Sequence, residues 1–155
     1  MNTCRLIVCE KSSHWAAALR LSLAGQPPEL VELRSLVQVE SALVESPASV
    51  VGMEISPANI NAVLDLLERA GRHFHRARFV AFVASGFADA VLLLREAGAI
   101  DVLTTVLDAG RLARLARRHH AAAPASGPLT MRALAAERLP WPAHATFPVN
   151  HAHAR

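Results

Sequence analysis

Residues 78–106 read RFVAFVASGFADAVLLLREAGAIDVLTTV, and this stretch decides the fold class of the chain. It begins with an apolar run at 78–85 that is rich in aromatic and β-branched residues, which is typical of a central β-strand covered on both faces. Residues 88–99 follow as a helix expected to end at Gly98, and 100–106 follow as a second strand. A strand, a helix and a strand in this order predict two parallel strands joined by a crossover.

The same alternation continues on both sides of this unit. Apolar runs suitable for further strands occur at 5–9, 29–35 and 49–56, and helical patterns occupy 12–25, 36–46, 57–71 and 107–120. The alternating pattern of 29–35 predicts a strand at the edge of a sheet. Five strand–helix pairs predict an α/β domain of (βα)5 type, in which a five-stranded parallel sheet lies between helices as a three-layer sandwich. Ligand chemistry in such a sheet is expected at the carboxyl ends of the strands.

Small polar residues mark the expected beginnings of three helices. Ser12 or Ser13 is expected to cap the first helix, Ser56 precedes Pro57 at the third, and Asp108 precedes the last. Each of these side chains can accept a hydrogen bond from an amide of the first helical turn, which is the reason for the preference.

The composition indicates one compact domain followed by a tail. Hydrophobic residues make up 52% of the 155 residues and charged residues 19%, which is ample for a core. We expect the domain at 1–120 and a mostly irregular tail, rich in Pro and Ala, at 121–155, within which 130–139 has the pattern of a short helix. The net charge of +3 does not by itself indicate a nucleic-acid partner.

The sequence indicates neither a membrane segment nor a cofactor. No apolar run reaches the roughly 20 residues of a membrane span, and the first residues lack the apolar region of a signal peptide, so a cytoplasmic, reducing setting is expected. Cys4 and Cys9 would lie about 16 Å apart on one strand, which is too far for a disulfide. No zinc-like spacing, phosphate loop or glycine-rich nucleotide motif occurs, so we expect no metal and no cofactor.

The stretch VASGFADAVLLLREAGAIDVLTTV (83–106) resembles the fourth helix and fifth strand of the CheY-like receiver domains of two-component response regulators. Gly98, Ala99, Asp101 and Leu103 stand where that family has them. RLIVCE resembles the opening strand with its acidic end, and MEISP resembles the strand that bears the phosphoacceptor and the loop after it. The resemblance covers residues 4–120 and implies a flavodoxin-like fold.

A phosphorylatable receiver needs a carboxylate acceptor, Mg²⁺ held by acidic groups, a hydroxyl and a lysine. The resemblance places these groups at Cys9, Glu10, Glu54, Val83 and Thr105, and Ser85 is a neighbour that could replace the hydroxyl. Only Glu10 keeps the expected chemistry. We interpret Glu54 as the remnant of an acceptor, a structural carboxylate rather than a mimic of phosphoaspartate. The resemblance therefore implies a degenerate pocket, or pseudo-receiver.

Cys9 has two interpretations. Lys11 and His14 are close to it in sequence and would favour a low thiol pKa and redox reactivity. A buried cysteine that acts as a small apolar residue is the more common case, and we favour it. Cys9, Glu10, Glu54 and Ser85 form no convincing acid–base pair at the strand ends, so no enzyme is expected.

Two surfaces are candidates for binding a partner. Four arginines lie on one side of the last helix: Arg111, Arg114, Arg117 and Arg118. Together with Arg95 of the preceding helix and Asp101 of the preceding strand, they mark the face that the resembled family commonly uses for dimers or partners. A solvated helix face is the alternative interpretation. Trp141 and Phe147 in the tail are compatible with packing onto the domain or with a docking peptide.

These observations predict a stand-alone, degenerate receiver-like domain that acts as a phosphorylation-independent protein-interaction module in bacterial signal transduction. Its expected partner is another signalling protein, a histidine kinase or a regulator, or a second copy of the chain, and no membrane. The alternative is a small basic nucleic-acid-binding adaptor that uses the arginine-rich last helix, although no aromatic residues lie between those arginines.

Overall fold

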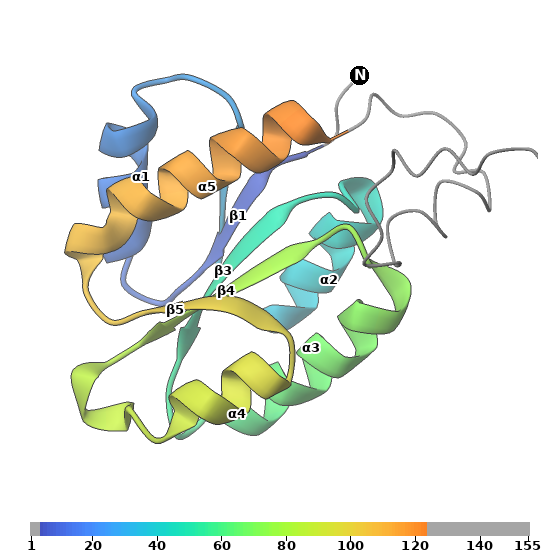
Figure 1. Ribbon diagram of the computed structural model, residues 1–155, viewed down its shortest axis with the longest axis vertical. Coiled ribbons are helices and arrows are strands. Elements are labelled where there is room, and N and C mark those ends of the chain that lie inside the picture. The colour runs from blue at the N-terminus through green and yellow to red at the C-terminus, as the bar shows by residue number, and fades with distance from the viewer. Residues whose placement is uncertain (1–3, 124–155) are drawn as a thin grey trace, which may run out of the picture.

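The computed structural model describes residues 4–123, in which strands and helices alternate throughout (Figure 1). The strands are β1 (Leu6–Cys9), β2 (Leu30–Leu33), β3 (Val50–Ile55), β4 (Arg78–Val83) and β5 (Ala99–Leu103). The α-helices are α1 (His14–Leu23), α2 (Leu36–Glu45), α3 (Ile60–His73), α4 (Ala90–Glu96) and α5 (Ala109–Ala122). Two short 3-10 helices, η1 (Ser85–Phe87) and η2 (Val106–Asp108), precede α4 and α5.

The strands form one parallel sheet in the order β2-β1-β3-β4-β5. Helices α1 and α5 cover one face, and α2, α3 and α4 cover the other (Figure 1). The prediction of a (βα)5 three-layer sandwich is confirmed, and β2 lies at an edge as its alternating sequence predicted. β3 and β4 are almost fully buried because helices cover both of their faces.

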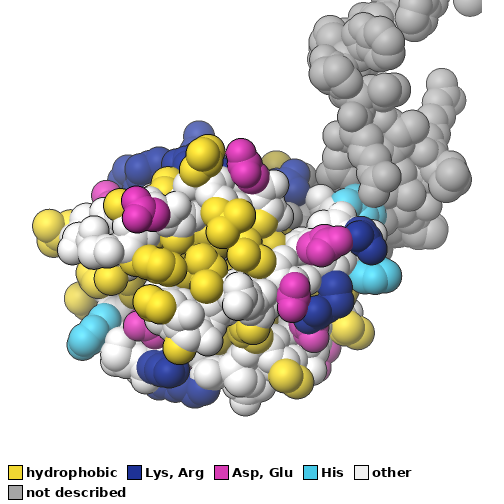
Figure 2. All heavy atoms as spheres, turned by 90° about the horizontal axis from the view of Figure 1, so that it is seen from below, with side chains coloured by type: hydrophobic (Ala, Val, Ile, Leu, Met, Phe, Trp, Pro, Cys, Tyr) yellow, Lys and Arg dark blue, Asp and Glu magenta, His cyan; other side chains and the backbone are white. Residues whose placement is uncertain are grey.

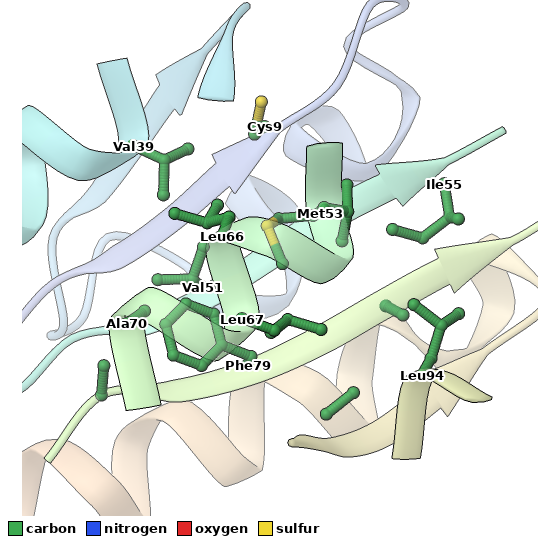
Figure 3. Packing of buried hydrophobic residues seen from close by; sticks show 14 of the residues in the cluster. Cys9, Val39, Val51, Met53, Ile55, Leu66, Leu67, Ala70, Phe79 and Leu94 are labelled. Atoms are coloured by element: carbon green, nitrogen blue, oxygen red, sulfur yellow. The ribbon is translucent and has the colours of Figure 1, made fainter. Parts of the chain in front are cut away.

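The core is divided into two layers by the sheet. The larger layer lies under α2 and α3, where Val39, Leu66 and Leu67 pack against Val51 and Phe79 of the sheet (Figure 3). The smaller layer lies under α1 and α5 and contains Leu6, Val8 and Leu112 among others. Alternate residues of each strand point into opposite layers, as strand geometry requires.

Gly52 in β3 allows a close packing arrangement in the smaller layer. A Cβ atom at this position would lie 2.2 Å from Cζ of Phe82, so the Phe82 ring occupies the space that a side chain would need. Trp15 of α1 stacks on that ring with centroids 4.0 Å apart and an interplanar angle of 8°. The Phe82 ring, packed on Gly52 and stacked with Trp15, thereby holds α1 over the sheet near the carboxyl ends of the strands.

The third helix begins later than the sequence predicted. α3 starts at Ile60, because the side chain of Asn59 organises a turn in place of a cap at Ser56. Asn59 Oδ1 accepts a hydrogen bond from the Ser56 amide, and its Nδ2 donates to the Glu54 carbonyl, each at 2.8 Å. The prediction that Ser56 caps a helix with Pro57 in first position is therefore wrong.

Other boundaries differ by a few residues. Asp108 stands at the N-cap of α5, but its side chain makes no capping hydrogen bond, so the predicted role of that carboxylate is wrong. α5 continues to Ala122, two residues past the expected domain limit. The helix expected at 130–139 and the side chains of Trp141 and Phe147 lie outside the described residues and stay predictions. Within residues 4–123 no helix is both long and apolar enough to cross a bilayer.

Candidate functional site

The candidate site lies at the carboxyl ends of the central strands, where two pockets open side by side. A pocket of about 250 Å³ is lined by Cys9, Glu10, Lys11, Arg34 and Glu54 among others, at the point where the chain order of the sheet reverses between β1 and β3. A smaller pocket of about 170 Å³ lies beside it. Val83 and Glu54 line this second pocket, and Ser85 and Thr105 line neither.

Glu10 serves the backbone of α1. Its side chain is 3% exposed, and its two carboxylate oxygens accept hydrogen bonds from the amides of Trp15 (3.0 Å) and Ala16 (2.7 Å). These charge-assisted bonds cap α1, and the partial positive charge at the helix N-terminus stabilises the carboxylate. Ser13 stands at the N-cap without a side-chain capping bond, so the prediction that Ser12 or Ser13 caps this helix is wrong.

Glu54 also bonds to backbone. Its Oε2 atom accepts a hydrogen bond of 2.8 Å from the amide of Lys11, which ties the loop after β1 to the end of β3. The side chain is only partly buried. This contact supports our interpretation of Glu54 as a structural carboxylate.

The surroundings of Cys9 favour the neutral thiol. Cys9 is 7% exposed and packs in the layer under α2 and α3 (Figure 3). Burial raises the pKa of the Cys9 thiol, the nearby Glu54 carboxylate raises that pKa further, and the guanidinium of Arg34 opposes both with a smaller effect. A thiol that stays protonated at neutral pH is a poor nucleophile, so the interpretation of Cys9 as a buried apolar residue is favoured over the redox interpretation.

The remaining positions supply neither a hydroxyl nor a cation to the pocket. Val83 is 2% exposed and packs in the core. Ser85 is exposed on η1, and the Oγ1 atom of Thr105 accepts a hydrogen bond of 3.3 Å from the amide of Leu107, where it caps η2. The structure therefore brings together Cys9, Glu10, Glu54 and Val83, but leaves Ser85 and Thr105 outside the pockets.

The residues of the pocket do not fit Mg²⁺. This ion requires several oxygen ligands in octahedral geometry. Both oxygens of Glu10 are bonded to the α1 amides, Cys9 offers a protonated thiol, and Lys11 and Arg34 bring positive charge to the same pocket. Among residues 4–123, no group of three or more His, Cys, Asp or Glu side chains could hold a metal ion.

Arg34 and Glu32 are residues of this site that sequence reasoning missed. Arg34 lines the larger pocket, and Glu32 is an ion-pair partner of its guanidinium. A signal was available, because residues i and i+2 of a strand point to the same face, so Glu32 and Arg34 on an edge strand were placed to interact. The alternation at 29–35 was used only to predict the strand.

The candidate interaction face centres on Asp101 of β5. Asp101 is 7% exposed, its Oδ2 lies 2.7 Å from Nη2 of Arg111, and its Oδ1 lies 3.4 Å from Nη2 of Arg95. These ion pairs link β5 to α4 and α5. Large hydrophobic side chains stand exposed on α4, on β5 and on η2, which precedes α5: Leu92, Leu93, Ile100, Val106 and Leu107. Figure 2 views the molecule from the side on which α4 lies in Figure 1, and hydrophobic side chains gather near the centre of this view.

The arginines of α5 do not act as one set of solvent-exposed cations. Arg117 Nη2 donates hydrogen bonds of 2.9 Å to the carbonyls of Ser22 and Leu23, and so caps the C-terminus of α1. Arg111 pairs with Asp101. Only Arg114 and Arg118 remain without an ion pair or hydrogen bond to the described residues, which weakens the nucleic-acid interpretation.

Element order and sheet order match the flavodoxin-like receiver fold, and the similar solved structures are receiver domains of CheY-like response regulators. The chain is similar to a CheY-like protein (tadZ) from Pseudomonas aeruginosa, with 23% identity, a TM-score of 0.62 and coverage of 74% of this chain and 98% of that one. A response regulator from Thermotoga maritima has 14% identity and a TM-score of 0.63, with 79% and 100% covered. A putative pilus assembly-related protein from Burkholderia pseudomallei has 19% identity and a TM-score of 0.51, with 78% and 92% covered.

The similarity to these structures establishes the fold alone. Sequence identities of 23%, 14% and 19% are too low to carry a function from those proteins to this chain. No protein-family model matches the sequence, and no curated protein matches it significantly. The resemblance inferred from residues 83–106 is thus confirmed for the receiver fold.

Proposed function

We propose that this protein is a degenerate receiver-like domain that acts as a phosphorylation-independent protein-interaction module in bacterial signal transduction, without catalytic activity of its own. The proposal rests on one observation, that the carboxylates of the pocket accept hydrogen bonds from backbone amides. Glu10 caps α1 and Glu54 holds the Lys11 amide, while Val83 is buried where phosphoryl chemistry needs a hydroxyl. A cytoplasmic setting, expected from the sequence, is part of this proposal.

The partner would bind at the face made by α4, β5, η2 and α5. An exposed apolar group surrounded by charged residues is typical of protein-binding surfaces, because burial of apolar area provides the affinity and charges provide the orientation. Leu92 of α4 and Leu107 of η2 are 68% and 93% exposed. The ion pairs of Asp101 link β5 to α4 and α5 in the same region. The partner in this proposal is a histidine kinase, a regulator or a second copy of the chain.

The names of the similar structures suggest where a partner can first be sought. One is a CheY-like protein named tadZ, and another is described as a putative pilus assembly-related protein. We therefore include components of pilus assembly among the candidate partners.

The proposal is tested by affinity capture from an extract of the native cell, with the full chain as bait and mass spectrometry to identify the signalling protein that is bound. Leu92→Glu and Leu107→Glu together should abolish capture, because each places a charge in the apolar group. Val37→Glu is the matched control, since Val37 is 72% exposed on α2, which packs on β1 and α3 rather than at the β5 edge of the sheet. Capture by wild type and control should be the same with and without acetyl phosphate.

Two results would contradict the proposal. One is a partner that the Leu92→Glu/Leu107→Glu chain still binds at wild-type strength. The other is a partner that is bound only after treatment with acetyl phosphate. A chain truncated after residue 123, measured in parallel, separates the contribution of the domain from that of the tail. Light scattering of the isolated chain decides whether the partner is a second copy.

A further inference from the structure

Arg34 makes four polar contacts at the mouth of the larger pocket. Its Nη1 donates to the carbonyls of Glu10 (3.0 Å) and Lys11 (2.9 Å). Its Nη2 donates to Ser13 Oγ (2.6 Å) and to Glu32 Oε1 (2.5 Å). Three of these four acceptors belong to residues 10–13, which we call the β1–α1 loop. The planar guanidinium suits this task because its donors point in fixed directions, whereas a lysine offers one point charge.

Glu32 holds the guanidinium in place. Its side chain is 14% exposed, and it accepts hydrogen bonds from Ser13 Oγ and from Nη2 of Arg20 on α1, the latter at 2.6 Å. The hydrogen bond from Ser13, followed by the hydrogen bond from Arg20, holds the pKa of the Glu32 carboxyl below its ordinary value. The carboxylate is therefore charged at neutral pH and pairs with both arginines.

The β1–α1 loop needs such support. Ser13 has a φ of 60°, in the left-handed region that residues other than glycine rarely adopt. The Lys11 amide of this loop donates to Glu54, and the Trp15 and Ala16 amides in the first turn of α1, which the loop leads into, donate to Glu10. Arg34 lines the same pocket as Cys9, Glu10 and Glu54, and its positive charge lowers the pKa of Cys9 while the two carboxylates raise it.

We propose that Arg34 is a built-in cation that organises the β1–α1 loop and offsets the carboxylates of the pocket, so that this chain needs no divalent ion to hold the pocket in one conformation. The resemblance to receiver domains implies a Mg²⁺ site, but the residues of this pocket do not fit that ion. The proposal follows from this difference. It extends the proposed phosphorylation independence to independence from metal. It concerns the isolated chain, and so can hold or fail whether or not the α4–β5–α5 face binds a partner.

Hydrogen exchange of the Lys11, Trp15 and Ala16 amides tests the proposal, measured by NMR on the full chain. In wild type, millimolar Mg²⁺ should leave the exchange rates of these amides unchanged. Arg34→Ala should accelerate their exchange by about tenfold or more, because the loop opens when its guanidinium contacts are lost. Arg34→Lys should also accelerate exchange, because it keeps the charge but cannot bond to four acceptors at once.

Arg20→Ala is the matched control. Arg20 pairs with the same carboxylate, but within the described residues it makes no hydrogen bond or ion pair to the β1–α1 loop, so this change should accelerate exchange by less than about threefold. Two results would overturn the proposal: slower exchange of these amides in wild type when Mg²⁺ is added, or equal effects of Arg34→Ala and Arg20→Ala. The Mg²⁺ titration of wild type requires no variant, so it remains decisive even if Arg34→Ala does not fold.

Discussion

Glu10 and Glu54 show how carboxylates at the ends of strands can serve the backbone. Glu10 caps α1 through two amides, and Glu54 accepts the amide of Lys11. In each case a single side chain connects two segments of the chain, which stabilises the local fold and leaves less capacity for a ligand. The two buried cysteines, Cys9 beside these carboxylates and Cys4 before the amino end of β1, have the complementary property, since burial disfavours their charged form.

Cys4 leads to a prediction about alkaline pH. Burial raises the pKa of the Cys4 thiol from 9.0 to about 11, so as pH rises the unfolded chain loses this proton before the folded chain does. The free energy of unfolding should therefore be unaffected by Cys4 below pH 9 and should fall between pH 9 and about 11. Urea denaturation across this range measures the slope.

The Cys4→Ala variant is the comparison for this measurement. The chain has no tyrosine and Lys11 is its only lysine, so few other groups titrate in the same range. The variant should show a shallower decrease of stability than wild type. Identical slopes in the two chains would mean that the Cys4 thiol ionises equally in the folded and unfolded states. Cys9, whose thiol pKa is also raised, should account for part of the slope that remains.

At the scale of elements, α1 is capped at both ends by side chains from other parts of the chain. Glu10 from the end of β1 bonds to its first amides, and Arg117 from α5 bonds to its last carbonyls. The α1 sequence supplies neither cap, because Ser13 makes no capping bond. The helix is therefore stabilised mainly by its position over the sheet, where Trp15 and Leu19 are buried.

Arg117→Ala should lower the free energy of unfolding by about 1–2 kcal/mol, because the carbonyls of Ser22 and Leu23 lose a charged hydrogen-bond donor. Arg118→Ala is the control, since Arg118 follows directly on the same helix, is exposed, and has no ion pair or hydrogen bond to the described residues. Its effect should stay below about 0.5 kcal/mol. Urea denaturation of both variants gives the comparison, and equal midpoints would contradict the capping role of Arg117.

At the scale of the whole molecule, the sheet order brings the carboxyl ends of β1, β3 and β4 together at one end of the sheet and thereby assembles the two pockets. The same order places β5 at the opposite edge from β2, between α4 and α5, where the exposed apolar residues and Asp101 lie. The receiver fold thus places the pocket and the candidate interaction face in one molecule, and the proposal is that only the face is used.

Beryllofluoride with Mg²⁺, an analogue of a bound phosphoryl group, should leave the amide NMR spectrum of this chain unchanged. Glu54 accepts the Lys11 amide, Val83 has no hydroxyl, and Thr105 carries no positive charge and lies outside the pockets, where its hydroxyl caps η2. A phosphorylatable receiver measured under the same conditions is the positive control. Saturable shifts at Lys11, Glu54 and Val83 would show that the pocket still accepts a phosphoryl group.

The fold was predictable to a large extent because its signals are local. The apolar runs at 49–56 and 78–85, the helical spacing between them and the alternation at 29–35 reflect burial on one or two faces, which each segment encodes by itself. The substitutions at Val83 and Thr105 were likewise visible once the segments were aligned with the resembled family. Helix starts were less predictable, since Asn59 and Glu10 bonded where Ser56 and Ser13 were expected to cap.

The sequence by itself determined a parallel (βα)5 sheet and its edge strand at 29–35, because these depend on residue type and periodicity. It also led to the prediction of a degenerate pocket. Only the tertiary structure decided which side chains hold these parts together. Arg34 reaches a carbonyl 24 positions away, and Arg117 reaches one 95 positions away. Such contacts depend on how strands and helices pack, and no local pattern encodes that distance. The same packing makes Glu10, which stands where the resembled family has an acidic residue, the cap of a helix.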